Sequence, residues 1–390
     1  MSSSVLHVNF SRSGGAGAVA RVLHEEQLRQ GMNSAFRHVI DSDLRSKPLS
    51  SPLHTVAAGL DHYVLKNPSF SAPISVLRER ASTSHPLKLD DYDIVHLHGV
   101  SGALSEKDWT SLSEAKKVVW TLHDMNPFTG ACHYSLGCEG YTTGCSSCPA
   151  VRTLARPTVA QAWETKRDRV SSLTNLTVVA PSDWLSRQAS SSGILGNQSL
   201  VVQHNPIQPV FCETPERRVR AENEMAVVVV AKNLDDEVKN VVQAVSAVKE
   251  ARQQRKDVTL TLVGQGGHGF AGPGIELAGA LSAPPLKDVF SRSDVLIVPS
   301  LAENAPLVIP EAAAQGVTPF VADVGGMPGL IDALGHGRVF SSTSELVGAL
   351  VSAASETNQT STQARETLRK AAVSQFSPEA VVAAYDKVYA

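Results

Sequence analysis

Two carboxylates eight positions apart, Glu303 and Glu311, are the residues whose types and spacing point most directly to chemistry. Glu303 follows the apolar run Val295–Pro299, which predicts a buried strand, and Glu311 falls in the first turn of the helix expected next. The carboxyl end of a parallel strand faces the crevice where α/β proteins bind ligands, and a helix N-terminus there attracts anions. This arrangement suits a ligand with hydroxyls and phosphates, such as a nucleotide sugar. Taken alone, the spacing is more often an ordinary capped helix after a strand.

Three further polar side chains follow other predicted strands. Lys232 and Lys239 come after the run Met225–Ala231, and His123 comes after Val118–Leu122. We expect Lys239 to lie at the start of a helix, where the helix dipole disfavours a positive charge unless an anion lies beside it. Each residue by itself is also explained as a solvated lysine or a structural histidine. Their shared position at strand ends makes them candidates for contact with one ligand.

Glycines at two strand ends would let the backbone approach a phosphate. Gly14 and Gly15 precede a helix predicted over Ala16–Gln30, and Gly264 begins a second glycine-rich loop. The first loop is not G-x-G-x-x-G, and no acidic residue ends the second predicted strand. The sequence therefore argues against a dinucleotide cofactor.

Four of the five cysteines lie within 17 residues and are spaced C-x5-C-x6-C-x2-C, namely Cys132, Cys138, Cys145 and Cys148. The final pair has the spacing of a zinc knuckle, and four thiolates suit tetrahedral Zn²⁺. Such a closed site would be structural, because it leaves no open position for a substrate. Disulfides and free thiols are the alternatives, and the odd number of cysteines argues against a disulfide framework.

Short apolar runs alternate with longer amphipathic ones, which predicts parallel sheets covered by helices. The pattern restarts near residue 210, so we expect one domain over 1–207 and a second over 208–376. Ser377 and Pro378 suit the N-cap and first position of a helix, and we expect residues 377–390 to pack back on the first domain. The predicted strands are Val5–Phe10, Ser34–Ile40, Asp93–His98, Val118–Leu122 and Leu176–Ala180, then Met225–Ala231, Val258–Val263, Asp294–Pro299 and Thr318–Asp323.

Length and composition exclude several classes of protein. The 390 residues carry a net charge of −3, which gives no argument for binding nucleic acid. No apolar run approaches the ~20 residues of a membrane span, and the N-terminus lacks the pattern of a signal peptide. We therefore expect a cytoplasmic protein. Two basic runs, Lys116–Lys117 and Lys166–Arg169, are more often solvated helix faces, but they leave open peripheral contact with anionic lipid at the inner face of the membrane.

Taken together, these motifs resemble the family 4 glycosyltransferases, a large retaining group with the GT-B fold. That fold has two Rossmann-like domains whose parallel sheets face each other across a cleft. Residues 121–130, with the cysteines after them, are similar to a bacterial subgroup that builds exopolysaccharide, capsule and colanic-acid-like glycans. The resemblance spans nearly the whole sequence and rests on Asp91–Gly99, Ala180–Leu185, His204–Ile207, Leu262–Gly266, Ser291–Ser300 and the E-x7-E element from Glu303 to Glu311.

The resemblance implies a metal-independent, retaining hexosyltransferase with an acceptor-side first domain and a donor-binding second domain. The donor would be a UDP or GDP sugar, and the acceptor a glycan, a lipid-linked glycan or a small molecule. Glu311 would accept from the ribose, Glu303 would bind the donor sugar, and Lys239 would hold the diphosphate. His123 would touch the donor sugar near the reacting carbon. The remaining donor-binding residues implied are Gly14, Gly15, Lys232, Gly264, Asn304, Ala305, Pro306 and Leu307.

Two departures from the family pattern leave alternatives open. Lys232 stands where an arginine is usual, and it offers a point charge rather than a bidentate fork. The Gly-Gly-x-Pro-Glu turn of the family ends here at Gly329, which offers no carboxylate. A sugar-nucleotide epimerase of the same fold and a nucleotide-sugar-binding protein without activity are therefore the alternatives. The sequence does not indicate the sugar, the acceptor or the oligomeric state.

Overall fold

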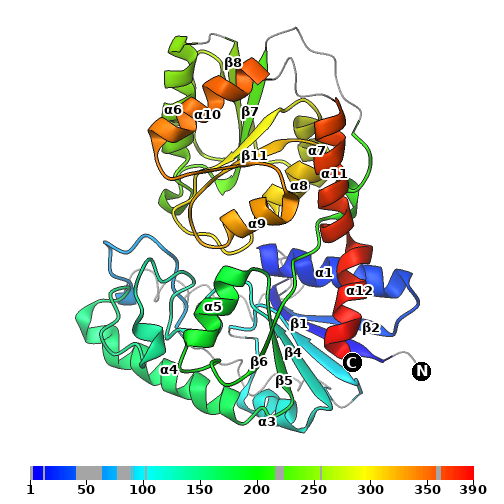
Figure 1. The fold of residues 1–390 in the computed structure, drawn as a ribbon. Coiled ribbons are helices and arrows are strands. Elements are labelled where there is room, and N and C mark those ends of the chain that lie inside the picture. The colour runs from blue at the N-terminus through cyan, green and yellow to red at the C-terminus, as the bar shows by residue number, and fades with distance from the viewer. Residues whose placement is uncertain are drawn as a thin grey trace. The chain divides into compact units, whose positions relative to one another are not determined.

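The computed structural model describes residues 3–11, 14–40, 64–76, 89, 91–101, 103–215, 224–254, 257–356 and 362–390. The chain divides into two compact units. The first comprises Met1–His204 together with Val381–Ala390, and the second comprises Asn205–Ala380. Each unit is built around its own six-stranded sheet (Figure 1). No helix within the described residues combines the length and the apolar character needed to cross a bilayer.

The sheet of the first unit has the strand order β2-β1-β3-β4-β5-β6, and every pairing in it is parallel. Its inner strands are buried along their length, as expected for a parallel sheet with helices on both faces. The elements are β1 Val5–Ser11, α1 Gly14–Arg29, β2 Ser34–Ile40, β3 Ile94–Leu97, α3 Glu106–Glu114, β4 Lys117–Thr121, α4 Arg156–Ser171, β5 Leu176–Ala180, α5 Asp183–Ser191 and β6 Ser199–Val202, with short 3-10 turns at Asn126–Phe128, Gly140–Thr142 and Thr153–Ala155.

The sheet of the second unit has the order β12-β11-β10-β7-β8-β9 and is also parallel throughout. Helix α6 packs against α10, and α11 packs against α8 (Figure 1). The elements are β7 Met225–Asn233, α6 Val241–Gln254, β8 Val258–Gln265, β9 Ile275–Gly279, α7 Ala283–Ser291, β10 Val295–Val298, α8 Val308–Ala314, β11 Thr318–Ala322, α9 Met327–Leu334, β12 Arg338–Phe340, α10 Thr343–Glu356 and α11 Thr362–Phe376, with 3-10 turns at Pro209–Phe211, Glu237–Lys239 and His268–Phe270.

The last helix, α12 (Pro378–Tyr389), begins in the second unit and ends in the first. Ser377 acts as its N-cap, because the Ser377 Oγ accepts from the N–H of Ala380 at 3.3 Å. Two tyrosines of α12 reach the first sheet. The hydroxyl of Tyr385 lies 2.7 Å from Thr121 Oγ1, and that of Tyr389 lies 2.8 Å from His96 Nδ1.

All nine predicted strands are confirmed to within two residues at their ends. The prediction missed three strands, β6, β9 and β12, and each of them is an edge strand of its sheet. Edge strands are short and half exposed, so their apolar pattern is weak; in β6 no residue is fully buried. The structure confirms two halves with parallel sheets, as the alternating pattern predicted.

Candidate functional site

The second unit has a topological switch point between β7 and β10. The chain passes from β7 outward to β8 and β9, and then returns to add β10, β11 and β12 on the other side of β7. Loops at the carboxyl ends of β7 and β10 therefore diverge and leave a crevice, which is where open α/β sheets bind ligands. Lys239 follows β7 and Glu303 follows β10, so both lie at this switch point.

Lys239 and Glu303 form an ion pair at the switch point. The Lys239 Nζ donates to Glu303 Oε1 at 2.5 Å, and Ser300 Oγ donates to the same oxygen at 3.2 Å. Glu303 is 7% exposed, whereas the lysine side chain is 29% exposed. The protein itself thus supplies an anionic partner for this lysine. One cation and one nearly buried carboxylate meet where a phosphorylated, hydroxyl-bearing ligand would enter.

The helix expected to start around Lys239 begins only at Val241. Asp236 accepts from the N–H of Val238 at 2.9 Å and caps a 3-10 turn over Glu237–Lys239, and Asn240 then adopts a left-handed backbone with φ 49°. The placement of Lys239 in the helix was therefore wrong: the residue ends a 3-10 turn, and α6 starts at Val241. The turn matters because it aims the lysine at the loop after β10.

Two glycines are required by close backbone contacts at this edge. A Cβ on Gly325 would lie 1.8 Å from the carbonyl oxygen of Glu303, and one on Gly264 would lie 2.0 Å from that of Ala231. Gly325 also has φ +60°, a conformation that other residues rarely adopt. The N–H of Gly326 donates to the same Glu303 oxygen at 3.3 Å. The glycine turn after β11 therefore holds the backbone of Glu303 in place.

Glu311 lies in the first turn of α8, as predicted, and is nearly buried at 6% exposure. Gln208 Nε2 donates to its Oε1 at 3.4 Å. Burial raises the pKa of Glu311 to about 7, although hydrogen bonds from the side chain and backbone of Gln208 act in the opposite direction. The loop that joins Glu303 to α8 has one buried residue and three partly exposed ones, in the order Asn304, Ala305, Pro306 and Leu307.

Lys232 differs from the other predicted residues of this unit because it is exposed at the end of β7. Gly264 lies within β8 rather than in the loop after it, since the strand continues to Gln265. Both residues still lie at the carboxyl ends of adjacent strands, β7 and β8. The structure thus brings Lys239 and Glu303 into contact and places Lys232, Gly264 and Glu311 along the same edge of the sheet.

In the first unit the switch point lies between β1 and β3. Gly14 and Gly15 are the first two residues of α1, after β1, and a Cβ on either would meet no atom within 4 Å. The backbone at the start of this 16-residue helix is therefore open to a ligand. The loop after β3 is tied to β1, because Gly99 N donates to Asn9 Oδ1 at 2.7 Å and Phe10 N donates to Gly99 O at 2.7 Å.

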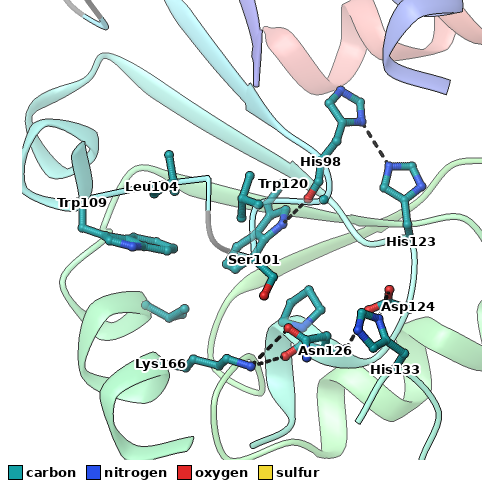
Figure 2. A pocket seen from close by; sticks show the side chains of 14 residues that line it. His98, Ser101, Leu104, Trp109, Trp120, His123, Asp124, Asn126, His133 and Lys166 are labelled. Carbon is teal, nitrogen blue, oxygen red and sulfur yellow. Dashed lines mark hydrogen bonds and ion pairs between the residues drawn. The ribbon is translucent and has the colours of Figure 1, made fainter. Parts of the chain in front are cut away.

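His123 follows β4 and lines a cavity in the first unit (Figure 2). Apolar side chains form one part of the wall, with Trp109 and Leu104 on the side away from His123 in this view. Trp120 is fixed by a 3.1 Å hydrogen bond from its Nε1 to the carbonyl of His98. The polar part of the wall is made by His98, Ser101, His123, Asp124, Asn126, His133 and Lys166.

Asp124, which the sequence analysis did not select, is the carboxylate of this cavity. It pairs with His133 Nδ1 at 2.6 Å and accepts from Asn126 N at 2.8 Å. Burial raises the pKa of Asp124, but the charge and hydrogen bond of His133 outweigh it, so the net shift is downward. Burial lowers the pKa of His123 to about 4, and the charge of Asp124 only partly opposes this shift. His123 is therefore a neutral imidazole beside an ionised carboxylate.

The basic residues of the run 166–169 are mostly buried in the structure. Lys166 is 8% exposed, and its Nζ donates to the carbonyls of Asn126 at 2.7 Å and Thr129 at 2.9 Å. Arg169 is also 8% exposed and pairs with Glu106. Two of the three basic residues of the run thus point inward, where they hold the loop after β4. Burial accordingly lowers the pKa of Lys166 to about 8.

Sequence reasoning also missed a group of histidines beneath this cavity. Nitrogens of His7, His96 and His98 all lie within 4.8 Å of one another, an arrangement that can hold a metal ion. Every one of these six ring nitrogens, however, already has a hydrogen-bond partner at 2.8–3.1 Å. The pattern Val-His-Leu-His at 95–98 was the available signal, because alternate residues of a strand share one face.

The four clustered cysteines lie in a segment with little regular structure, and Cys132, Cys145 and Cys148 are buried. All are thiols without a disulfide partner. Backbone N–H groups point at the sulfurs: Gly130 N lies 3.3 Å from Cys145 Sγ, and Gly140 N lies 3.4 Å from Cys138 Sγ. A hydrogen bond from Cys132 and others from the backbone lower the pKa of Cys148 to about 7. The sulfurs do not form a group as close as the three histidines, so the zinc site stays a prediction.

Comparisons with known proteins found a matching family model, a curated relative and similar solved structures. Residues 225–356 match the family model described as glycosyl transferases group 1. The chain is 25% identical over 331 residues to the putative colanic acid biosynthesis glycosyl transferase WcaC of Escherichia coli K12, covering 78% of this chain and 79% of that protein. Residues 225–356 include every donor-binding residue predicted in the second unit, from Lys232 to Glu311.

Solved structures show the same fold at low sequence identity. A glycosyltransferase from Rickettsia africae superposes with a TM-score of 0.62 at 12% identity, covering 100% of this chain and 98% of its own. The Anabaena protein HepE, solved in complex with UDP-glucose, superposes with a TM-score of 0.60 at 13% identity, covering 99% of both chains. At such identities the superpositions establish the fold alone.

The two parallel sheets and these superpositions define a protein with the GT-B fold, as predicted. The matches also confirm the resemblance to the family 4 glycosyltransferases: residues 225–356 are a glycosyltransferase group 1 domain, and the protein is a glycosyltransferase.

Proposed function

We propose that the protein is a retaining, metal-independent hexosyltransferase that uses a nucleoside diphosphate sugar in the synthesis of cell-surface polysaccharide. The WcaC relative is named for colanic acid biosynthesis, and HepE was solved with UDP-glucose, so a UDP sugar is the first donor to test and a GDP sugar the second. The acceptor is a glycan, a lipid-linked glycan or a small molecule. The family and relative that match favour transfer over the epimerase and the inactive binding protein.

The observation that carries this proposal is the Lys239–Glu303 pair at the switch point of the second sheet. A donor presents a diphosphate and a ring of hydroxyls to one small region, and it needs a cation and an acceptor side by side. Lys239 turns toward phosphate oxygens when the donor binds, and Glu303 keeps its acceptor role by receiving sugar hydroxyls in place of the ammonium. Lys232, exposed at the end of β7, adds a second positive charge for the diphosphate.

Glu311 receives the ribose hydroxyls in this proposal. Within the described residues, the hydrogen-bond donors to its carboxyl come from Gln208, and an ionised carboxylate in so buried a place gains from two further donors. The backbone of Asn304, Ala305, Pro306 and Leu307 lines the donor sugar, and Gly264 lets the chain approach the diphosphate closely. In the first unit, Gly14 and Gly15 offer backbone N–H groups, and His123 contacts the donor sugar.

The chemical step must stabilise the negative charge that develops on the departing diphosphate. Preorganised cations and N–H donors supply this stabilisation without reorganising at the moment of reaction. The two glutamates do not act as the acid and nucleophile of a glycosidase, because that chemistry needs two carboxyls flanking one bond. We assign them to opposite ends of the donor, the sugar and the ribose. Retention then follows from attack on the same face that the diphosphate leaves, with a phosphate oxygen accepting the proton of the acceptor hydroxyl.

The cysteine segment is proposed to hold one structural Zn²⁺ through Cys132, Cys138, Cys145 and Cys148. The chemistry of the donor set supports this: three sulfurs are buried, and N–H groups from Gly130 and Gly140 already stabilise negative charge on sulfur. The metal would tie down a stretch that has 3-10 turns but no long helix or strand. It would take no part in transfer.

Isothermal calorimetry of the purified protein tests the donor proposal. The ligands are UDP, GDP, UDP-glucose and GDP-mannose, and Glu311→Ala is the control variant. We expect one nucleotide series to bind and the variant to lose at least tenfold in affinity, since two charge-assisted hydrogen bonds are removed. Absence of binding by the wild-type protein to all four ligands would overturn the proposed function.

A further inference from the structure

Four histidines meet in the first unit beneath the cavity. His7 on β1 and His96 on β3 are register partners, and His98 lies two residues after His96, directly past the end of β3, so all three are on one face of the sheet. His7 and His96 are 0% exposed and His98 is 1% exposed. His98 and His123, the latter after β4, are the two members that line the cavity (Figure 2). Buried polar groups in this number require a specific hydrogen-bond pattern.

The pattern is a line of hydrogen bonds that starts on helix α1. Gln27 Oε1 lies 2.8 Å from His7 Nε2, and His7 Nδ1 lies 3.0 Å from His98 Nε2. His98 Nδ1 in turn lies 3.1 Å from His123 Nε2, the bond drawn in Figure 2. Three bonds thus connect a glutamine on α1 with the imidazole at the cavity. We call this line the Gln27–His123 chain.

Each ring in the chain is neutral. Burial lowers the pKa of His7 to about 4, and it holds the pKa of His98 well below its ordinary value, with the neighbouring rings adding to the effect. A neutral imidazole carries one N–H and one lone pair, so it donates at one nitrogen and accepts at the other. If the donating nitrogen of the first ring is fixed, the donating nitrogen of every later ring in the chain is therefore fixed as well.

Gln27 determines which nitrogen of the first ring, His7, donates. Its Nε2 donates to the hydroxyl of Tyr389 at 3.2 Å, which turns its oxygen toward His7 and toward Ser34, whose Oγ donates to it at 2.8 Å. An amide oxygen only accepts, so His7 donates from Nε2 and must accept at Nδ1. His98 then donates from Nε2 and accepts at Nδ1, where it receives the Nε2 proton of His123.

We propose that Gln27, His7 and His98 are positioning residues that hold His123 in its Nε2–H tautomer, so that Nδ1 accepts a hydrogen bond from a sugar hydroxyl. The inference rests on the proposed function in one respect, namely that His123 contacts the sugar. An accepting nitrogen selects a hydroxyl and disfavours a carboxylate, because two lone pairs would face each other. The sugar group expected at His123 is therefore a hydroxyl rather than a carboxylate.

The tautomer can be measured directly. Long-range ¹H–¹⁵N correlation spectra of ¹⁵N-histidine-labelled protein distinguish a protonated ring nitrogen from one with a lone pair, and His123→Asn identifies the signals of His123. We expect His123 in the wild-type protein without ligand to show a protonated Nε2 and an unprotonated Nδ1. A protonated Nδ1 would overturn the inference whatever the variants do.

Two variants test the origin of the tautomer. Tyr389→Phe removes the hydroxyl that orients Gln27 and that also lies 2.8 Å from His96 Nδ1, which is outside the chain. Gln27→Leu removes the accepting oxygen, and either variant should give His123 a mixture of tautomers. Gln30→Leu is the matched control, because Gln30 is exposed in the turn directly after the same helix and bonds to Glu26 instead. A His123 spectrum that is unchanged in a folded Tyr389→Phe protein, like that of the control, would also contradict the inference.

Kinetics separate this inference from the proposed function. With UDP-glucose as probe, Tyr389→Phe should lower kcat for donor turnover about tenfold, the worth of one hydrogen bond, and leave the Kd for UDP unchanged. If wild-type protein neither binds nor turns over any nucleotide sugar while His123 is the Nε2–H tautomer, the proposed function fails and the positioning chain stands. If the donor is turned over and His123 is protonated on Nδ1, the function stands and this inference fails.

Discussion

Replacing Glu311 by glutamine removes a carboxyl group of the second unit whose pKa is strongly raised in the folded protein. The residue is 6% exposed, and Gln208 is its hydrogen-bond donor. Burial raises its pKa from 4.5 to about 7, with the bonds from Gln208 opposing the shift. The folded protein therefore holds this proton more tightly than the unfolded chain does.

The sign and size of the effect follow from that difference. For a raised pKa, the stabilisation is complete below the unfolded value of 4.5 and is lost as the pH rises through about 7. The shift corresponds to about 3 kcal/mol of unfolding free energy once the carboxyl is ionised. Glutamine is neutral at every pH and avoids this loss. At pH 8.5 the variant should melt roughly 6–12 °C above the wild-type protein, for a unit of this size.

Differential scanning calorimetry at pH 5 and pH 8.5 is the assay. The gain should be large at pH 8.5 and small at pH 5, where the wild-type carboxyl is still protonated. Glu276→Gln is the matched control, because Glu276 is an exposed carboxyl on β9 of the same unit. A difference between Glu311→Gln and wild type that is the same at both pH values would refute the reasoning.

Donor binding supplies the second half of this test. Only the ionised carboxylate accepts from both ribose hydroxyls, so the affinity of the wild-type protein for UDP-glucose should rise up to about tenfold per pH unit between pH 5.5 and 7. UDP-glucose is suitable because its diphosphate does not titrate in this range. The Glu311→Gln variant should bind weakly and without this pH dependence. Greater stability with weaker binding is the trade expected at a functional site.

Three further predictions concern the remaining residues. Lys239→Ala should lower donor turnover by about 10²–10³, because it removes a cation from the departing diphosphate, whereas Lys232→Ala at the exposed strand end should cost less; equal effects in steady-state kinetics would count against the role of the ion pair. Gly325→Ala should destabilise the protein by about 2 kcal/mol or more from its backbone strain and close contact, while Gly329→Ala, where an added Cβ meets no atom within 4 Å, should be neutral or slightly stabilising in thermal melts. Purified protein should contain one zinc per chain by inductively coupled plasma mass spectrometry, and Cys148→Ser should lower that content; a metal-free, fully folded wild type would exclude the zinc site.

Local patterns were sufficient for nine of the twelve strands in the described residues and for their order along the chain. Valine-rich runs such as Met225–Ala231 and the N-cap Ser377 lie as predicted, because a strand's apolar pattern and a cap's side chain act within a few residues. Glu303, Glu311 and Lys239 were selected because each follows a strand or opens a helix. The same local view misplaced the start of α6, since it did not anticipate that Asn240 would take a left-handed conformation.

The contacts that give these residues their chemistry were decided by the tertiary structure. Lys239 and Glu303 are 64 positions apart and meet because β7 and β10 are neighbours across a switch point. His7 and His98 are 91 positions apart and meet because β1 and β3 are paired. Periodicity in a sequence reports which face of an element is buried, but not which element covers it. The candidate residues could thus be selected from the sequence alone. Their partners, burial and protonation depend on the order of strands in the two sheets.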